Sequence, residues 1–382
     1  MQAKLPTVVR TEQTERASMS TRRTIAAKGM ANSCYFRTST VGRERKALLQ
    51  ITERCNLHCA HCFVSAVRDG TDIPLEKIRE RILPQLVHAR VARLTLTGGE
   101  PFAHPDLIDI VRAARSVEMT VTICTNGTLI DEHDLDAMQT IGGVTCNVSL
   151  DGFSAESHGK FRGNPESFQQ TVATVRRLGE RGLIKGLLAT PNTLAEASEF
   201  ARLCEFAKEC GAEYVLMNPL ASMGRGVRGA RRLASDEQHL REIARLTDPF
   251  AGADLDVVQI RFPNDKAPLS GCEAGTIIYV FATGEVTVCP YLVFAARTPG
   301  SKHAPADFIV GNILTDSDIA RRLDAYRLHD RSTAPADPTC GSCAMASGCG
   351  RGCPAAVIAA GGHLGERDRE QCPIADEKQV AA

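Results

Sequence analysis

Short apolar runs alternate with amphipathic stretches from Lys46 to about residue 250. The apolar runs predict strands, at Ala47–Ile51, Ala92–Thr97, Thr120–Cys124, Val144–Leu150, Ile184–Thr190 and Tyr214–Met217. The amphipathic stretches predict helices, at Leu75–Ala89, Pro105–Val117, Glu166–Arg181 and Leu194–Cys210. In the first of these helices the apolar residues recur at spacings of three and four, which gives it one buried face; they are Leu75, Ile78, Ile82 and Leu86.

This alternation of strands and helices indicates a parallel sheet with crossover helices. About six β/α units fit before residue 250, fewer than the eight of a closed barrel. We therefore expect an α/β fold whose main domain, residues 46–250, is a partial, TIM-like (β/α)6 barrel. In such folds ligands bind at the C-terminal ends of the strands, in the loops that follow them.

The regions on either side of the barrel have a different character. Residues 1–45 are polar and lack apolar periodicity, so we expect a flexible N-terminal tail. After Asp248 the alternation is broken by Pro and Gly residues, and cysteines become frequent. We expect residues 251–382 to form a cysteine-rich domain that is held by metal clusters more than by a hydrophobic core.

Charge and hydropathy exclude several classes of function. The 45 basic and 45 acidic side chains give a net charge of zero, which argues against a broad nucleic-acid-binding surface. No stretch approaches the roughly eighteen uninterrupted apolar residues of a transmembrane helix. The arginines near the N-terminus have no apolar core behind them, so they do not form a secretory signal. We expect a cytoplasmic protein without nucleic-acid or membrane partners.

The chain contains 15 cysteines, and most of them are clustered. In a chain without a secretory signal, such clusters argue for metal ligation rather than disulfides. Three lie within Cys55–Cys62, and a second group comprises Cys272, Cys289, Cys340, Cys343, Cys349, Cys353 and Cys372. The other five are scattered: Cys34, Cys124, Cys146, Cys204 and Cys210. Of these, Cys124 and Cys146 sit in strand patterns and are most simply explained as small buried residues.

The first cysteine group has the spacing CxxxCxxC and follows the first predicted strand; its members are Cys55, Cys59 and Cys62. Three thiolates complete neither a tetrahedral zinc site nor the four ligands of a cubane cluster. A [4Fe–4S] cluster held here would therefore keep one iron open to a substrate or cofactor. A structural zinc or iron site with a distant fourth ligand is the alternative.

A Gly98-Gly99-Glu100-Pro101 turn follows the second predicted strand. Its two glycines permit close approach of the backbone to a ligand, and Glu100 offers a carboxylate to an ammonium group. Taken alone, the turn is explained equally well as an ordinary connection between a strand and a helix. Its occurrence one strand after the cysteine loop favours a catalytic site.

Together the two motifs resemble those of the radical S-adenosylmethionine (SAM) enzymes over about residues 46–250. The resemblance implies that the three cysteines hold a [4Fe–4S] cluster whose open iron binds the amino and carboxylate groups of SAM. It implies contacts to the methionine amino group from Gly98, Gly99 and Glu100.

The same resemblance implies further SAM contacts, each of which also has an ordinary structural explanation. His61 occupies a position close to the adenine, although a neutral surface histidine is the simpler alternative. Ser149 and Asp151 would lie on the ribose and carboxylate sides, and Arg162 would bind the SAM carboxylate. A serine at a strand end and an arginine at a helix start are also common without a ligand.

The seven C-terminal cysteines, together with Phe308–Asn312, resemble the SPASM domain, which carries auxiliary iron–sulfur clusters in a subset of radical SAM enzymes. One implied cluster is held by Cys340, Cys343, Cys349 and Cys372, and the other by Cys272, Cys289 and Cys353. Some members add a cysteine about six residues after the first, where this chain has Ile278. The second cluster is therefore expected to have an open iron or a ligand other than cysteine. A zinc ribbon, which needs only four of the seven cysteines, is the alternative.

The resemblance implies reductive cleavage of SAM to a 5′-deoxyadenosyl radical, which abstracts hydrogen from a substrate C–H bond. It favours oxidative modification of a ribosomally made peptide, by a cross-link, a thioether or dehydrogenation. A dehydrogenase or epimerase of a small metabolite, such as an aminocyclitol or sugar, is the alternative, and a non-catalytic electron carrier comes third. Expected partners are an electron donor such as flavodoxin or ferredoxin and a separate leader-peptide-binding protein. Arg225 or Arg228, in or beside the loop after the sixth strand, is a candidate for binding a substrate carboxylate.

Overall fold

The computed structural model describes residues 29–35, 44–332, 334 and 337–374. A ten-stranded sheet runs through the described part, in the order β10-β9-β8-β1-β2-β3-β4-β5-β6-β7. Its strands are β1 (Arg45–Thr52), β2 (Val91–Gly98), β3 (Thr120–Thr125), β4 (Val144–Ser149), β5 (Ile184–Ala189), β6 (Tyr214–Met217), β7 (Asp256–Gln259), β8 (Ile277–Val280), β9 (Glu285–Thr287) and β10 (Ile309–Asn312).

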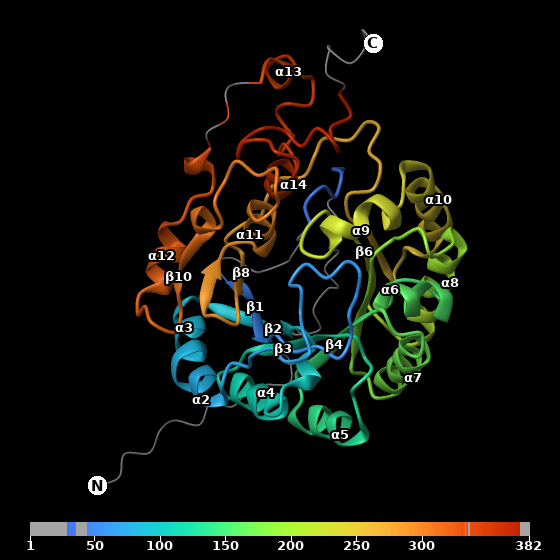
Figure 1. Ribbon diagram of the computed structural model, residues 1–382, viewed down its shortest axis with the longest axis vertical. Coiled ribbons are helices and arrows are strands. Elements are labelled where there is room, and N and C mark those ends of the chain that lie inside the picture. Colours follow the sequence, from blue (N-terminus) through green and yellow to red (C-terminus); the bar gives the residue numbers. More distant parts are fainter. Residues whose placement is uncertain (1–28, 36–43, 333, 335–336, 375–382) are drawn as a thin grey trace, which may run out of the picture.

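Helices fill the connections between successive strands from β1 to β7 and the connection from β9 to β10, and they cover the outside of the curved sheet (Figure 1). Those before β7 are α2 (Leu75–Lys77), α3 (Leu83–His88), α4 (Leu107–Ser116), α5 (Glu132–Ile141), α6 (Lys160–Arg162), α7 (Ser167–Glu180), α8 (Ala197–Glu209), α9 (Gly226–Leu233) and α10 (Glu237–Thr247). Those after it are α11 (Pro290–Ala296), α12 (Ile319–Ala325), α13 (Pro338–Gly341) and α14 (Pro354–Ala359).

Strands β1 to β7 are all parallel, and at least one helix connects each of them to the next. This confirms the α/β class and the partial barrel. The six predicted strands coincide with β1 to β6, and Ile78, Ile82 and Leu86 form the fully buried face expected of the first helix. A seventh strand, β7, pairs with β6, so the barrel sheet continues past the expected boundary at residue 250.

The C-terminal region extends the same sheet on its other side. Strand β8 pairs with β1 in parallel, with Ile278 opposite Ala47, and β9 and β10 follow in antiparallel fashion. Every residue of α11 is buried, and its side chains belong to the same hydrophobic core as the barrel. The expectation that metal clusters hold this region more than a hydrophobic core is therefore wrong for residues 277–296.

A short segment of the expected N-terminal tail packs against the C-terminal region. Ala31 forms a parallel bridge with Leu269, and its N–H donates a hydrogen bond of 2.9 Å to the carbonyl of Pro268. In Figure 1 this segment, residues 29–35, lies near α14 in the C-terminal region and well away from β1. The expectation of a free tail is thus wrong for residues 29–35, whereas residues 1–28 and 36–43 lie outside the described part of the chain.

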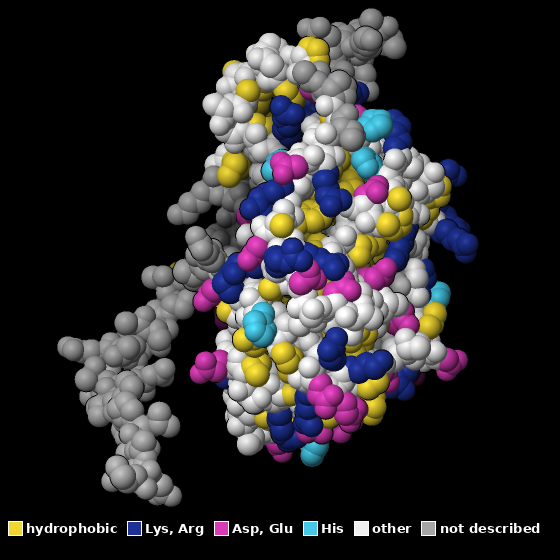
Figure 2. Space-filling view, turned by 90° about the vertical axis from the view of Figure 1, so that its left-hand side faces the viewer, with side chains coloured by type: hydrophobic (Ala, Val, Ile, Leu, Met, Phe, Trp, Pro, Cys, Tyr) yellow, Lys and Arg dark blue, Asp and Glu magenta, His cyan; other side chains and the backbone are white. Residues whose placement is uncertain are grey.

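The described surface is of mixed charge. Figure 2 shows basic and acidic side chains interspersed over one face, in keeping with the net charge of zero. Among the described helices, none has the length and apolar composition needed to cross a bilayer.

Candidate functional site

A cavity of about 330 Å³ lies at the C-terminal ends of the parallel strands. Loops that follow β1, β2, β3, β4 and β6 all contribute to its walls, as does α11. All ten residues predicted to bind the first cluster or SAM line it: Cys55, Cys59, His61, Cys62, Gly98, Gly99, Glu100, Ser149, Asp151 and Arg162. Residues spread over more than a hundred positions of sequence thus share a single cavity, because parallel strands end at the same edge of the sheet.

The cysteine loop after β1 is anchored by backbone hydrogen bonds. The N–H of Cys55 donates to the carbonyl of Val67 at 2.8 Å, and the N–H of Leu57 points at the Cys55 sulfur at 3.4 Å. Cys59 is buried, while Cys55 and Cys62 are half-buried. Burial raises the pKa of Cys55 to about 12 and also raises that of Cys59, so each thiol needs a cation or a metal to become a thiolate.

Arg225 holds this loop in place. Its Nε donates to the carbonyl of Cys59 at 2.9 Å, and its Nη1 donates to the carbonyl of Ala66 at 2.8 Å. Its backbone N–H adds a third bond, to the carbonyl of Cys62 at 3.0 Å. The structure therefore gives Arg225 a supporting role, in place of the substrate carboxylate considered for it from the sequence, and leaves the side chain of Arg228 exposed.

The two glycines at the end of β2 are required by the close approach of the end of β1 and the start of the cysteine loop. A Cβ on Gly99 would lie 2.1 Å from the carbonyl oxygen of Arg54, and one on Gly98 would lie 2.4 Å from that of Thr52. The N–H groups of Gly99 and Glu100 donate to those same two carbonyls, at 2.9 and 2.7 Å. The glycines thus permit close contact between the two motifs, a reason that does not depend on a ligand.

Glu100 is buried and ties β2 to the loop after β3. Its carboxylate accepts hydrogen bonds from the Thr125 hydroxyl at 2.7 Å, the Asn126 N–H at 2.7 Å and the Phe102 N–H at 3.2 Å. Burial raises the pKa of Glu100 to about 6 even though these donors favour the ionised form. The carboxylate keeps acceptor capacity for one further donor.

Asp151 and Arg162 form a buried ion pair beside Cys59. Nε of Arg162 donates to Oδ2 of Asp151 at 2.6 Å, the other carboxylate oxygen accepts from the Thr190 N–H at 2.8 Å, and Nη1 lies 3.8 Å from the Cys59 sulfur. Burial is the largest single influence on Asp151 and would raise its pKa, but the charge and hydrogen bond of Arg162 together with His61 and His158 outweigh it, so the pKa is lowered. Ser149 ends β4 on the same wall.

His61 stacks face to face on Phe161, with ring centroids 4.5 Å apart. Burial lowers its pKa to about 4, so the imidazole is neutral at neutral pH. Its Nδ1 has no hydrogen-bond partner among the described residues, and neither does Oδ1 of Asn218 on the same cavity wall. Buried polar atoms without partners are rare in folded proteins, and both of these belong to residues that line the cavity.

The seven C-terminal cysteines fall into the two groups that the sequence predicts. Cys340, Cys343, Cys349 and Cys372 line one cavity, which Arg351 and Arg367 also border. A second cavity is lined by Cys272, Cys289 and Cys353. In the described part of the chain, no three cysteine sulfurs lie within 4.8 Å of one another, whereas a single zinc ion holds thiolates about 3.8 Å apart.

Sequence reasoning missed one cysteine of this second cavity, Cys34. It had been grouped with the scattered cysteines because no motif surrounds it. A hydrogen bond from its thiol lowers the pKa of Cys353. Only the fold could identify it, because its neighbours lie more than 230 positions away in sequence.

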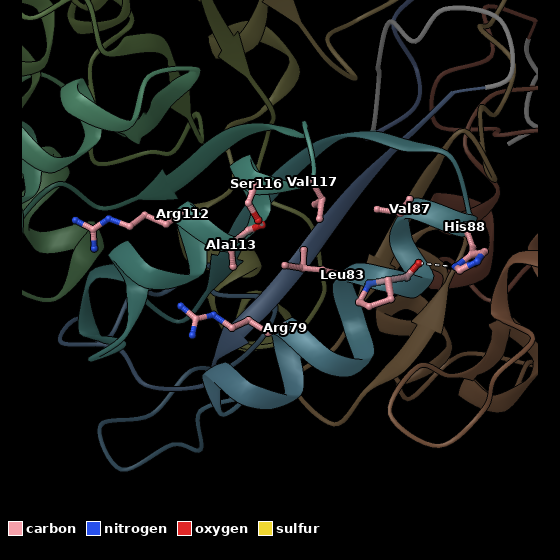
Figure 3. A pocket seen from close by; sticks show the side chains of 9 residues that line it. Arg79, Leu83, Val87, His88, Arg112, Ala113, Ser116 and Val117 are labelled. Carbon is pink, nitrogen blue, oxygen red and sulfur yellow. Dashed lines mark hydrogen bonds between the residues drawn. The ribbon is translucent and has the colours of Figure 1, made fainter. Parts of the chain in front are cut away.

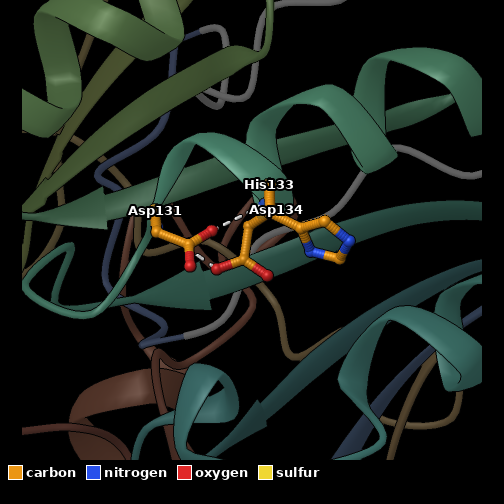
Figure 4. Close-up of side chains that lie close together, drawn as sticks. All are labelled: Asp131, His133 and Asp134. Carbon is orange, nitrogen blue, oxygen red and sulfur yellow. Dashed lines mark hydrogen bonds between the residues drawn. The ribbon is translucent and has the colours of Figure 1, made fainter.

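Two other surface features lie outside the predicted sites. A groove of about 650 Å³ between α3 and α4 is lined by apolar side chains with Arg79 and Arg112 at one end (Figure 3), and it contains no predicted site residue. The cluster of Asp131, His133 and Asp134 in Figure 4 is the exposed start of α5, where the two aspartates exchange capping hydrogen bonds with each other's backbone. Capping accounts for that cluster without a metal.

Comparison with known proteins agrees with this geometry. Residues 49–204 match the model of the radical SAM superfamily. The antilisterial bacteriocin subtilosin biosynthesis protein AlbA of Bacillus subtilis is 27% identical over 277 residues, covering 71% of this chain and 58% of AlbA. The chain thus spans less than two thirds of that relative. The AdoMet-dependent heme synthase of Methanosarcina barkeri is 26% identical over 270 residues, covering 64% of this chain and 76% of the synthase.

Among solved structures, SuiB of Streptococcus suis bound to S-adenosylmethionine has a similar fold, with a TM-score of 0.65 at 18% identity over 86% of this chain and 77% of SuiB. SuiB has also been solved bound to its precursor peptide SuiA. The matched family model agrees with the cysteine loop after β1 and with the glycine turn at the end of β2. Residues 49–204 therefore form a radical SAM domain, and members of that superfamily use a [4Fe–4S] cluster and SAM.

Proposed function

We propose that this chain is a radical SAM enzyme that oxidatively modifies a ribosomally made peptide. The observation that carries the proposal is the single cavity on which three thiols and the seven predicted SAM contacts converge. In it, Cys55, Cys59 and Cys62 would hold the [4Fe–4S] cluster. When bound, this cluster supplies the electron that cleaves SAM to methionine and a 5′-deoxyadenosyl radical, while auxiliary clusters supply an acceptor for the electron that an oxidised product leaves.

The protein's own groups would bind and orient SAM beside the thiols. Glu100 has one acceptor position left for an N–H of the methionine amino group, and Gly98 and Gly99 bring the backbone of this turn against the cysteine loop. Arg162 places positive charge beside Cys59, where the SAM carboxylate would lie. The neutral His61 ring offers an unpartnered nitrogen to the adenine, and Ser149 offers a hydroxyl on the ribose side.

Apolar side chains form part of the cavity lining. Phe63, Val64, Leu220 and Tyr291 line it. Exclusion of water from such a site protects a reactive radical from side reactions. Hydrogen abstraction then converts the radical to 5′-deoxyadenosine and the substrate C–H to a carbon radical. Loss of one electron and one proton from that carbon radical and its bonding partner completes a cross-link or a desaturation.

We further propose that the C-terminal cysteines hold two auxiliary clusters. Four thiols around one cavity and three predicted thiols around another support this assignment. With three cubane clusters, the anaerobically reconstituted protein should contain about twelve irons per chain. Fewer than about eight would contradict the three-cluster assignment.

A peptide substrate is supported by two of the relatives. AlbA is a bacteriocin biosynthesis protein, and SuiB has been solved with a precursor peptide. An electron donor such as flavodoxin or ferredoxin and a separate leader-peptide-binding protein would complete the system. The similarity to a heme synthase favours a second candidate, the oxidation of a small metabolite.

One experiment separates the two candidates. The reconstituted enzyme is incubated anaerobically with SAM, a reductant and deuterated forms of the short peptides encoded beside its gene. We expect deuterium in the 5′-deoxyadenosine and a peptide that has lost two hydrogens. Deuterium transfer from porphyrin or sugar substrates, with none from any of the peptides, would contradict the peptide assignment.

A further inference from the structure

Cys34 is the fourth thiol at a site where the sequence predicts three. It lines the same cavity as Cys272, Cys289 and Cys353. Only 3% of its surface is exposed. The sulfur lies 3.4 Å from the carbonyl oxygen of Gly271 and 3.7 Å from that of Gly352, and these residues immediately precede Cys272 and Cys353.

The segment that carries Cys34 is fixed by hydrogen bonds of the two residues that precede it, Asn32 and Ser33. The Ser33 hydroxyl lies 3.0 Å from that of Ser270, and the Ser33 N–H donates to the same Ser270 oxygen at 3.2 Å. The backbone N–H of Arg261 donates to the carbonyl of Asn32 at 2.7 Å, and the Arg261 side chain donates to the carbonyl of Ser33 at 3.1 Å. All of these contacts join the segment to residues just before Cys272.

Arg261 also connects this segment to the last cysteine of the group. Its guanidinium forms a buried ion pair with Asp368, whose carboxylate accepts a hydrogen bond from the Cys353 N–H at 3.2 Å. A buried cation therefore lies between the segment of Cys34 and the backbone of Cys353. Asp368 and Glu370 already balance the charge of this cation, so Arg261 connects the segment of Cys34 to Cys353 without adding net positive charge.

We propose that Cys34 is the fourth thiolate of the auxiliary cluster held by Cys272, Cys289 and Cys353. The inference rests on the proposed auxiliary clusters and specifies one of them. Ile278, at the position where a fourth cysteine was sought in the sequence, is fully buried in β8 and pairs with β1. The missing ligand thus comes from the N-terminal segment.

A cluster with four thiolate ligands has no open iron. It can exchange electrons with a substrate radical, but it cannot bind the substrate through iron. Tyr35 lines both this cavity and the main cavity, and its ring stacks on Tyr291 at 4.8 Å. The proposed cluster therefore shares a wall with the main cavity while its irons remain fully ligated.

The inference can be tested in the full chain after removal of the first cluster by C55A, C59A and C62A. This parent is reconstituted, reduced and exposed to ¹³C-labelled cyanide, a small ligand for an open iron. Its paramagnetic resonance spectrum should show no ¹³C hyperfine coupling. Adding C34A should create one such coupling, whereas the control C204A, which removes an equally buried thiol from α8, should not.

Cys34→Ser provides a second measurement that a merely structural role would not change. An alkoxide in place of the thiolate should alter the Mössbauer parameters of about one in eight auxiliary irons. A ¹³C coupling already present in the parent would overturn the inference. So would C34A and C34S spectra identical to those of the parent. Either result would leave the proposed auxiliary clusters intact. A parent without C-terminal iron would instead overturn the proposed clusters themselves.

Discussion

Nε of Arg162 donates a 2.6 Å hydrogen bond to Oδ2 of Asp151, and both side chains are almost fully buried beside Cys59. The pair joins the end of β4 to the helical turn that carries Arg162. A buried ion pair is worth little compared with well-packed apolar residues, but removal of one partner leaves an uncompensated charge. The pair should therefore matter to both stability and SAM binding.

Asp151→Ala should lower the free energy of unfolding by about 3–5 kcal/mol, because it leaves the Arg162 guanidinium buried without its carboxylate. Asp109→Ala, which removes an exposed i,i+3 partner of Arg112, should cost less than about 1 kcal/mol. Denaturant unfolding of the two variants, side by side under anaerobic conditions, measures the difference. Equal stabilities would contradict the structural role given to the buried pair.

SAM affinity should increase as the pH rises through about 6, because the Glu100 carboxyl, whose pKa burial raises to about 6, ionises there. Below that pH the protonated carboxyl is a weaker acceptor for the N–H of the methionine amino group. Glu100→Gln should weaken SAM binding by about tenfold or more at pH 7.5, since a hydrogen bond to a charged group contributes about 1.5–3 kcal/mol. Equilibrium dialysis with labelled SAM at several pH values gives both results.

The matched control for this experiment is Glu76→Gln, because Glu76 is exposed at the start of α2. It should keep the affinity and the pH dependence of the parent. A Glu100→Gln variant that retained both would show that Glu100 serves only to hold the loop after β3.

Gly99→Ala should abolish assembly of the first cluster, because its Cβ would lie 2.1 Å from the carbonyl oxygen of Arg54. The backbone cannot give way without moving Cys55. Iron content should fall by about a third, the share of one cubane in three. Gly252→Ala, at a glycine with open space around it, should keep its full iron content. A fully loaded Gly99→Ala protein would contradict the tight contact between the two motifs.

Arg225→Ala should destabilise the first cluster, because it removes two hydrogen bonds that hold the carbonyls of Cys59 and Ala66. We expect iron to be lost to a chelator several-fold faster than from the parent. Arg228→Ala, three residues along and exposed, is the control and should behave like the parent. Equal rates in both variants would return Arg225 to the list of candidate substrate ligands.

The sequence predicts the barrel and its site well because the information is local. Each of β1 to β6 is a short apolar run, and the site residues follow the ends of these strands, which parallel topology brings to one edge. Even so, the functions of individual residues depend on the fold. The spacing of Gly98 and Gly99 suggests a ligand, whereas their closest neighbours are the backbone atoms of Thr52 and Arg54.

The C-terminal half was predicted less completely because its contacts are not local. Strand β8 pairs with β1 across more than two hundred residues of sequence. The sequence pattern around β8 therefore does not indicate that this strand joins the barrel sheet. Cys34 meets its neighbours across a similar separation, and the polar residues around it predict a tail. A lone cysteine in such surroundings gives no signal until the fold brings it to Cys353.

The most direct test of the central claim is the formation of 5′-deoxyadenosine by the reconstituted protein with SAM and dithionite, with and without the thiols of the first loop. Our account predicts reductive cleavage by the parent and none by the variant that combines C55A, C59A and C62A. That variant should still contain the irons of the auxiliary clusters. If it cleaved SAM as fast as the parent, the assignment of the CxxxCxxC loop as the site of radical formation would be wrong.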